Sequence, residues 1–260
     1  YVLNYDDQSG RTDVVTSGRG IHKTVYLHRN TVEEDLDSWR VRQMVRLARE
    51  LKIVCGDIPI AIEFVLDSVQ EMHLLQVRQI STSRSWHPEV EERVNWRLPH
   101  IAKFIGEASR RKPGLFGDRT IFANMPDWNP AEIIGTAPGA LAVSLYRHLI
   151  MDETWATQRS EYGYRDVRPA PLLVEFAGHL YVDVRASFAS FLPEELPEEL
   201  AGRLLSFYLE WLRQRPELHD KVEFEIVFSC YTLDLPDRLK SLKEAGFSDN
   251  ECKIVSESLR

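Results

Sequence analysis

The sequence predicts an α+β fold in which small antiparallel sheets pack against helices. Two apolar, β-rich runs, Ile60–Leu66 and Met72–Ile80, flank a polar turn, which is typical of a β-hairpin. Farther along the chain, apolar residues recur at helical spacing over 194–214. We therefore expect a mostly antiparallel sheet with a packed helix, followed by a mixed helical and β domain.

The residues before the central hairpin predict strands and one helix. Residues 1–29 alternate short β-like runs with turns. Thr31 is followed three residues later by Glu34, which is the pattern of a capping box. We expect a helix from Val32 to about Leu51, and its apolar residues fall largely on one side, so that it packs on a sheet.

Three polar side chains interrupt the apolar runs of the hairpin: Glu63, Gln76 and Arg78. Gln76 and Arg78 share a face because they are two residues apart in one strand. If the connecting loop is Ser68–Glu71, Glu63 lies opposite Gln76. Carboxylate and amide oxygens suit Mg²⁺ with substrate phosphates, and a guanidinium suits a phosphoryl group. The spacing equally allows these residues to be the solvated face of an amphipathic hairpin.

Helical segments are expected on both sides of a long loop. Residues 84–117 read as a helical connector interrupted at Pro99, whose ring clashes with the preceding turn. A second helix is expected over Ala140–Thr157 from its spaced apolar residues. Both predictions depend on the spacing of apolar residues and on the positions of Pro and Gly.

The loop between these helices, residues 119–139, is rich in Pro and Gly and holds Asp127 and Trp128. Long loops without regular structure in compact domains are often functional. Two interpretations stay open. Trp128 fills a gap in a core while Asn129-Pro130 starts a helix, or the loop binds a ligand.

A second hairpin is expected from Pro171–Phe176 and His179–Val184 across a short Ala-Gly turn. Asp183 and Arg185 lie at its far end. With two more arginines they form a candidate site for an anionic or hydroxylated substrate, made of Arg165, Arg168 and Arg185 with Asp183. The open alternative is a set of internal ion pairs, Asp183–Arg185 and Asp166–Arg168.

The last part of the chain reads as one strand and two helices. Val222–Cys230 alternates, which predicts a strand with Phe224 inward and Glu223 on the opposite face. Helices are expected over 236–245 and after Ser248, which begins a second capping box.

Composition narrows the class of protein. The formal net charge of −8 argues against a nucleic-acid partner, and no apolar run is long enough to predict a membrane span. The three cysteines are widely separated and form no zinc motif, so a reducing cytoplasm is the expected compartment. Because Tyr1 starts directly in a strand-like run, we expect the chain to be a piece of a longer protein.

The stretch around the central hairpin, I-E-F followed by L-Q-V-R-Q-I, closely resembles the end of the ATP-grasp domain in the phosphoenolpyruvate synthase and pyruvate phosphate dikinase family. The resemblance implies that Glu63 and Gln76 hold Mg²⁺ at the phosphates of ATP and that Arg78 contacts a phosphate. The family usually has Asp where this chain has Ala61, and Pro where it has Gln79.

The resemblance also divides the chain. Residues 1–83 are expected to be the later part of an ATP-grasp lobe, and 118–260 a mixed domain that loosely resembles the central region of rifampin phosphotransferases, which helps receive the acceptor substrate. The implied function is part of an ATP-dependent phosphotransferase with an unknown small-molecule acceptor. The family's histidine-bearing domain and N-terminal lobe are absent from the chain, so we expect it to be inactive without the remaining domains.

A different class of function stays open beside this one. Ala61 and Gln79 depart from the family pattern, which suits a non-catalytic binding or interaction module that keeps an ATP-grasp-like sheet. A further hypothesis is that residues 118–260 form a separate ligand-binding domain in which Asp183 and Arg185 touch the ligand.

Overall fold

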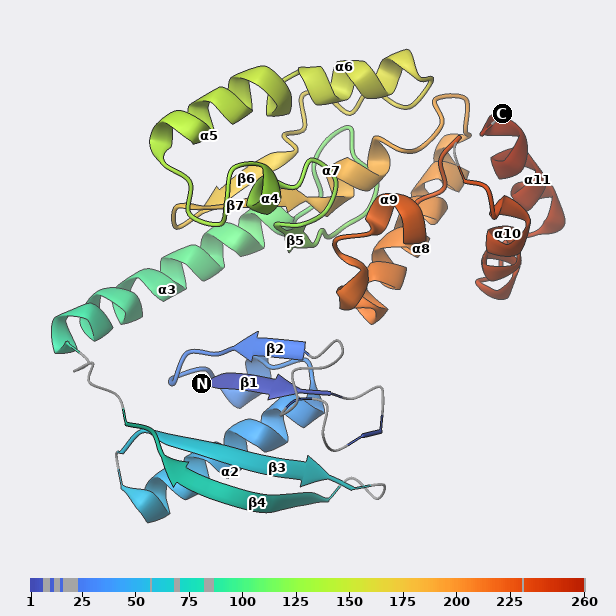
Figure 1. Ribbon diagram of the computed structural model, residues 1–260. Helices are drawn as coiled ribbons and strands as arrows, with labels where there is room; N and C mark the ends of the chain where they lie inside the picture. Colours follow the sequence, from blue (N-terminus) through green and yellow to red (C-terminus); the bar gives the residue numbers. More distant parts are fainter. Residues whose placement is uncertain are drawn as a thin grey trace. The chain divides into compact units, whose positions relative to one another are not determined.

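The chain is an α+β protein with small antiparallel sheets, which confirms the predicted fold class (Figure 1). The structure is a computed structural model and describes residues 1–6, 10–11, 15, 23–56, 58–67, 71–81, 87–230 and 232–259. It divides into two compact units, Tyr1–Glu91 and Glu92–Arg260. No helix in the described part of the chain has both the length and the apolar character needed to cross a bilayer.

The first unit consists of two hairpins joined through one helix. Its elements are β1 (Val2–Tyr5), β2 (Lys23–Tyr26), a 3-10 turn η1 (Glu33–Asp35), α2 (Trp39–Cys55), β3 (Ile60–Leu66) and β4 (Met72–Gln79). β1 pairs with β2 and β3 with β4, both antiparallel. Val41, Met44 and Val45 of α2 are buried with Leu3, and Phe64 packs against this cluster. The helix therefore packs on a sheet, as its apolar side predicts.

α2 begins seven residues later than the capping box predicts. The hydroxyl of Thr31 donates to the carbonyl of His28 instead of capping a helix. A single 3-10 turn follows, and Leu36 then adopts extended backbone angles. Ser38 is the residue that caps α2, since its side chain accepts a hydrogen bond from the amide of Val41.

The second unit contains one three-stranded sheet among helices. Its elements are α3 (Pro88–Ser109, beginning in the first unit), β5 (Phe122–Ala123), α4 (Pro130–Ile133), α5 (Ala140–Tyr146), a π-helical turn η2 (Arg147–Met151), α6 (Thr154–Glu161), β6 (Leu173–Phe176), β7 (His179–Asp183), α7 (Val184–Ala189), α8 (Glu198–Gln214), a 3-10 turn η3 (Pro216–Leu218), α9 (Val222–Glu225), α10 (Leu235–Glu244) and α11 (Asp249–Ser258). The antiparallel sheet has the order β5-β7-β6, and α10 packs against α11 (Figure 1).

A large apolar core holds this second unit together. Phe188 of α7 and Tyr208 of α8 are almost fully buried, and their rings meet edge to face. Tyr208 also contacts Phe228, and its hydroxyl accepts a hydrogen bond from the amide of that residue. The buried residues of α8 recur at helical spacing, which confirms the predicted helix and its apolar side: Leu200, Leu204, Leu205, Tyr208 and Leu212.

Two helix predictions need correction. α3 continues through Pro99 rather than breaking there. Pro99 is exposed on a helix without a buried residue, so water can reach the backbone carbonyl that lost its partner. The single helix expected over Ala140–Thr157 is divided into α5, a π turn and α6, because the backbone passes through a five-residue turn at Arg147–Met151.

The predicted strand Val222–Cys230 is a helical turn instead. Lys221 accepts backbone hydrogen bonds from the amides of Phe224 and Glu225, which closes α9. The three residues that follow α9 are consecutively buried, and such a run cannot alternate between two faces: Ile226, Val227 and Phe228. Phe224 is 74% exposed rather than inward.

Candidate functional site

The register of β3 and β4 sets Glu63 directly opposite Gln76, as the expected loop length predicts. Arg78 lies opposite Ala61, two residues along the same face. A register shift follows between Glu63 and Phe64. Residues 68–70 of the expected loop lie outside the described residues. The three predicted site residues are thus brought together on one face of the hairpin.

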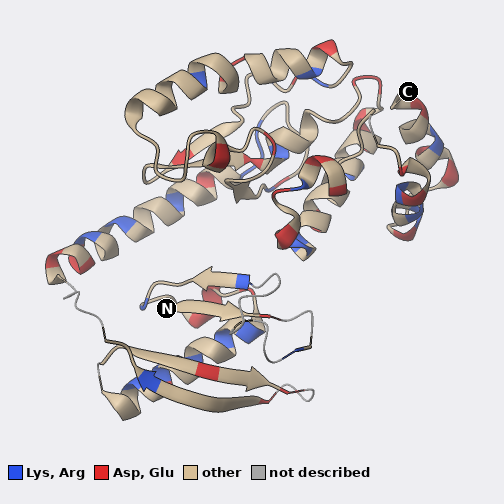
Figure 2. Cartoon of the chain, in the orientation of Figure 1, with Lys and Arg blue, Asp and Glu red and all other residues tan. Residues whose placement is uncertain are grey.

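This face points away from the helix that the hairpin covers. Glu63, Gln76 and Arg78 are exposed, whereas Phe64 and Met72 on the other face pack against the α2 core. The acidic residue of β3 is Glu63 and the basic residue of β4 is Arg78, and both strands are otherwise free of Lys, Arg, Asp and Glu (Figure 2). No hydrogen bond or ion pair joins the three side chains to other described residues. They are free to bind a ligand, and equally free to be solvated.

A second group of polar side chains lies at the turn of the same hairpin. Possible ligand atoms of Asp67, Glu71 and His73 lie within 4.8 Å of one another, and His73 Nε2 is 2.9 Å from an Asp67 carboxylate oxygen. Glu71 and His73 are exposed. An imidazole with two carboxylates suits a transition metal better than Mg²⁺, which prefers oxygen ligands.

The predicted substrate residues Asp183 and Arg185 are fully buried. Asp183 ends β7 and caps α7, and one of its oxygens lies 2.8 Å from Lys112 Nζ and 3.9 Å from Arg185 Nη2. The hydroxyl of Thr120 donates to the other oxygen over 2.6 Å. The internal ion-pair alternative is the one present, and neither side chain has any surface that a substrate could contact.

The other two arginines of that candidate set also have internal partners. Arg168 forms an ion pair with Asp166 at 2.5 Å, as the same alternative predicts. Arg165 donates to the carbonyl of Leu196. The three arginines therefore do not gather into one anion site.

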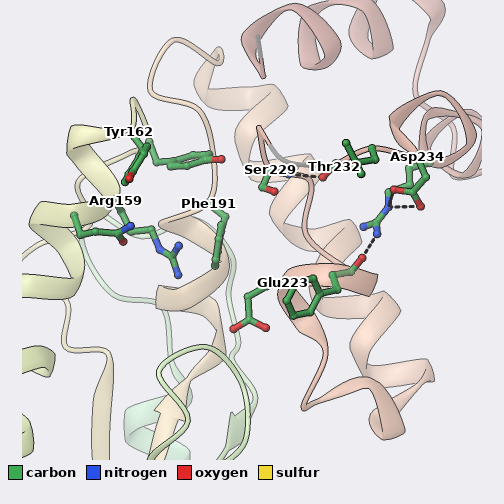
Figure 3. A pocket seen from close by; sticks show the side chains of 12 residues that line it. Arg159, Tyr162, Phe191, Glu223, Ser229, Thr232 and Asp234 are labelled. Atoms are coloured by element: carbon green, nitrogen blue, oxygen red, sulfur yellow. Dashed lines mark hydrogen bonds and ion pairs between the residues drawn. The ribbon is translucent and has the colours of Figure 1, made fainter.

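Sequence reasoning did not find a cavity of about 430 Å³ that lies between α6 and α9 (Figure 3). Aromatic and charged side chains line it, from α6, from the turn after α7, from α9 and from the segment leading into α10. Its volume lies in the range of small-molecule pockets, roughly 300–1,000 Å³.

One wall of this cavity contains Arg159, which belongs to a buried ion pair. Arg159 of α6 donates to Asp127 over 2.6 Å, and the Asp127 side chain is 3% exposed. The hydroxyl of Ser187 donates to the other oxygen of Asp127 over 2.8 Å. The guanidinium lies 3.7 Å from the centre of the Phe191 ring, a cation–π contact. Asp127 adopts a left-handed φ of 54°, which is uncommon outside glycine.

Glu223 of α9 projects toward this wall (Figure 3). Burial raises the pKa of its carboxyl, and the nearby charge of Asp127 raises it further, while Arg159 acts in the opposite direction. Tyr164 lines the same cavity, and burial raises its pKa to about 12. Its hydroxyl accepts a hydrogen bond from the amide of Cys230 over 2.9 Å.

The mouth of the cavity is apolar. Tyr162, Phe224 and Leu233 line it and are 57%, 74% and 98% exposed. Arg238, also in the lining, forms an ion pair with Asp234 at 3.0 Å and donates to the carbonyl of Phe224. Large exposed apolar side chains around a concave opening are a common property of binding sites.

Little in the sequence points to these residues. Asp127 lies in the loop for which a binding role was one of two interpretations, whereas Glu223 was placed in a strand and Arg159 in no motif. The other interpretation of that loop is present: Trp128 packs against the core and Asn129 caps α4, with Pro130 at its first position.

The chain was compared with protein-family models, with curated proteins and with solved structures, and none of the three comparisons found a match.

Proposed function

We propose that the chain supplies phosphate contacts for Mg·ATP as part of an ATP-dependent phosphotransferase resembling phosphoenolpyruvate synthase. The observation that carries the proposal is the register of the central hairpin. It sets Glu63 opposite Gln76 with Arg78 on the same exposed face. A carboxylate, an amide and a guanidinium share one patch of sheet, and none of the three forms a hydrogen bond or ion pair with a described side chain.

The donor set fits the cofactor. Glu63 offers a carboxylate and Gln76 an amide oxygen, and hard cations such as Mg²⁺ take oxygen ligands from one or two side chains and from substrate phosphates. Bound Mg²⁺ neutralises charge on the phosphates of ATP. Both side chains are exposed, and holding the ion would break no hydrogen bond to another residue that the structure describes.

Arg78 would orient a phosphate and stabilise its charge. Its guanidinium is planar and can donate two parallel hydrogen bonds to phosphate oxygens. The position opposite it in the ladder is Ala61, where the resembling family usually has Asp. Because Ala61 has no carboxylate, the residue opposite Arg78 does not offset the positive charge that a phosphate would meet.

The same Ala61 supports the rival function, a binding or interaction module without phosphoryl transfer. An alanine in place of the aspartate that the resembling family usually has beside the site would suit a sheet that binds nucleotide and transfers no phosphate. The acceptor, which we propose to be a small molecule, and the remaining domains of the longer protein belong to the first proposal only.

Calorimetric titration with Mg·ATP tests the proposal, on this chain and on the longer protein of which we propose it is a part. We expect binding by the longer protein, lost in Glu63→Ala and weakened in Gln76→Ala and Arg78→Ala. Glu50→Ala is the matched control, an exposed glutamate on α2 of the same unit. Titration with Mg²⁺ alone on Asp67→Asn separates the cluster at the hairpin turn from the proposed site.

Two outcomes would decide against phosphoryl transfer. Unchanged Mg·ATP binding in Glu63→Ala would reduce Glu63, Gln76 and Arg78 to a solvated face. Binding without turnover in the longer protein would favour the binding module.

A further inference from the structure

Two arginines and two acids line the cavity between α6 and α9, and each arginine already has a carboxylate partner. Arg159 pairs with Asp127, and Arg238 pairs with Asp234. Glu223 is the other acid of the lining, and it forms no ion pair with another described residue. When Glu223 is ionised, the groups at the cavity therefore carry one negative charge in excess.

Aromatic rings line the same cavity as this carboxylate, which has no ion-pair partner among the described residues. Tyr162, Tyr164 and Phe224 line the cavity together with Phe191 (Figure 3). The guanidinium of Arg159 already lies over Phe191, and Tyr164 is buried, so Tyr162 and Phe224 are the exposed rings that a ligand can contact. Ring faces attract cations and accept apolar groups equally well.

We propose that this cavity binds an organic cation, an amine carried on a ring-sized apolar body. The ammonium pairs with Glu223, and the apolar body lies against Tyr162 and Phe224 at the mouth. The site lies entirely within the second unit, and it stands whether or not the hairpin binds Mg·ATP.

Charge decides against the two other ligand classes of this size. An anion would enter a cavity in which both arginines already have carboxylate partners, and among its described charged residues the one without an ion pair is an acid. A neutral hydroxylated ring would fit the aromatic walls but would leave the charge of Glu223 without compensation in a half-buried place.

Three small probes of the same shape test the charge preference: benzylamine, benzyl alcohol and benzoate. Each is titrated into the full 260-residue chain and followed by ligand-observed NMR. We expect benzylamine to bind about tenfold or more tightly than benzyl alcohol, because the ammonium forms an ion pair with Glu223 that the hydroxyl cannot form. Benzoate should bind most weakly. Equal binding of all three, a preference for benzoate or benzyl alcohol, or no binding of benzylamine would overturn the proposal.

A matched pair of variants locates the site. Glu223→Gln removes the charge and keeps the shape, and should weaken benzylamine binding about tenfold while leaving benzyl alcohol unchanged. Glu225→Gln is the control, since Glu225 is exposed on the same short helix and does not line the cavity. Unchanged benzylamine binding in a folded Glu223→Gln, or equal loss in both variants, would overturn the proposal. The charge series on the unmodified chain decides the question even if Glu223→Gln does not fold.

Discussion

Asp127 and Arg159 form a buried ion pair between a loop and a helix, with 2.6 Å between carboxylate and guanidinium. The pair fixes the loop before α4 against α6, and Ser187 of α7 donates to the same carboxylate. Three segments distant in sequence therefore meet at one acid, directly behind the cavity that Glu223 enters.

Removing the charge of Asp127 should destabilise the second unit strongly. Asp127→Asn keeps the size of the side chain and tolerates the left-handed φ, but leaves Arg159 buried without its counterion. We expect a loss of about 3 kcal/mol in the free energy of unfolding, measured by urea denaturation. Asp166→Asn, which breaks an exposed pair with Arg168, should lose less than about 1 kcal/mol. Equal losses would contradict a special role for the buried pair.

Asp183 should matter to stability and not to ligand binding. Asp183→Ala removes the cap of α7, the hydrogen bond from Thr120 and the counterion of Lys112, and we expect a loss of about 3 kcal/mol or more. Asp183→Asn keeps an oxygen for the cap and for Thr120, so thermal denaturation should show a smaller loss. A variant as stable as the unmodified chain would show that the buried network contributes nothing net.

The raised pKa of Glu223 makes stability depend on pH in a defined direction. Because burial and Asp127 raise the pKa of the folded state above that of the unfolded chain, the folded state binds the extra proton. This contribution to stability is complete below the ordinary pKa of glutamate and is lost as the pH rises through the raised one.

Glu223→Gln should therefore gain stability relative to the unmodified chain as the pH rises from about 4 to 8, with a plateau above the raised pKa. Unfolding by urea at several pH values measures this difference. Arg159 opposes the shift, as do hydrogen bonds from the backbone of Glu223 and of Asp127 to the carboxyl. A difference that stays constant across this range would show that Glu223 keeps its ordinary pKa in the folded chain.

The turn between β6 and β7 offers a test of backbone strain alone. Ala177 and Gly178 have φ values of 51° and 82°, the left-handed angles of a two-residue hairpin turn. Gly178→Ala should cost about 1 kcal/mol although a Cβ there meets nothing within 4 Å. Ala177→Gly relieves the same strain and should be neutral or stabilising. Thermal denaturation compares the two, and equal shifts in Tm would argue against a conformational origin.

Several elements could be predicted from the sequence because their signals are local. Alternation and a polar turn were sufficient for the hairpin of β3 and β4, and the loop length was sufficient to place Glu63 opposite Gln76. Helical spacing of leucines identified α8, and the box at Ser248 identified the start of α11. In these places a few neighbouring residues hold most of the interactions that select the conformation.

The cavity and the residues that line it could not be predicted from the sequence, because they come from segments that are distant along the chain. Arg159 lies 32 residues after Asp127, and Glu223 lies in a segment whose alternating pattern predicted a strand. The consecutive burial of Ile226, Val227 and Phe228 selects a helical turn there, and this turn places Glu223 beside Asp127. The proximity of Glu223 and Asp127 depends on how α6, α9 and the loop pack. The free energy of burying apolar residues in the core outweighs the weak local preference of four residues for a strand.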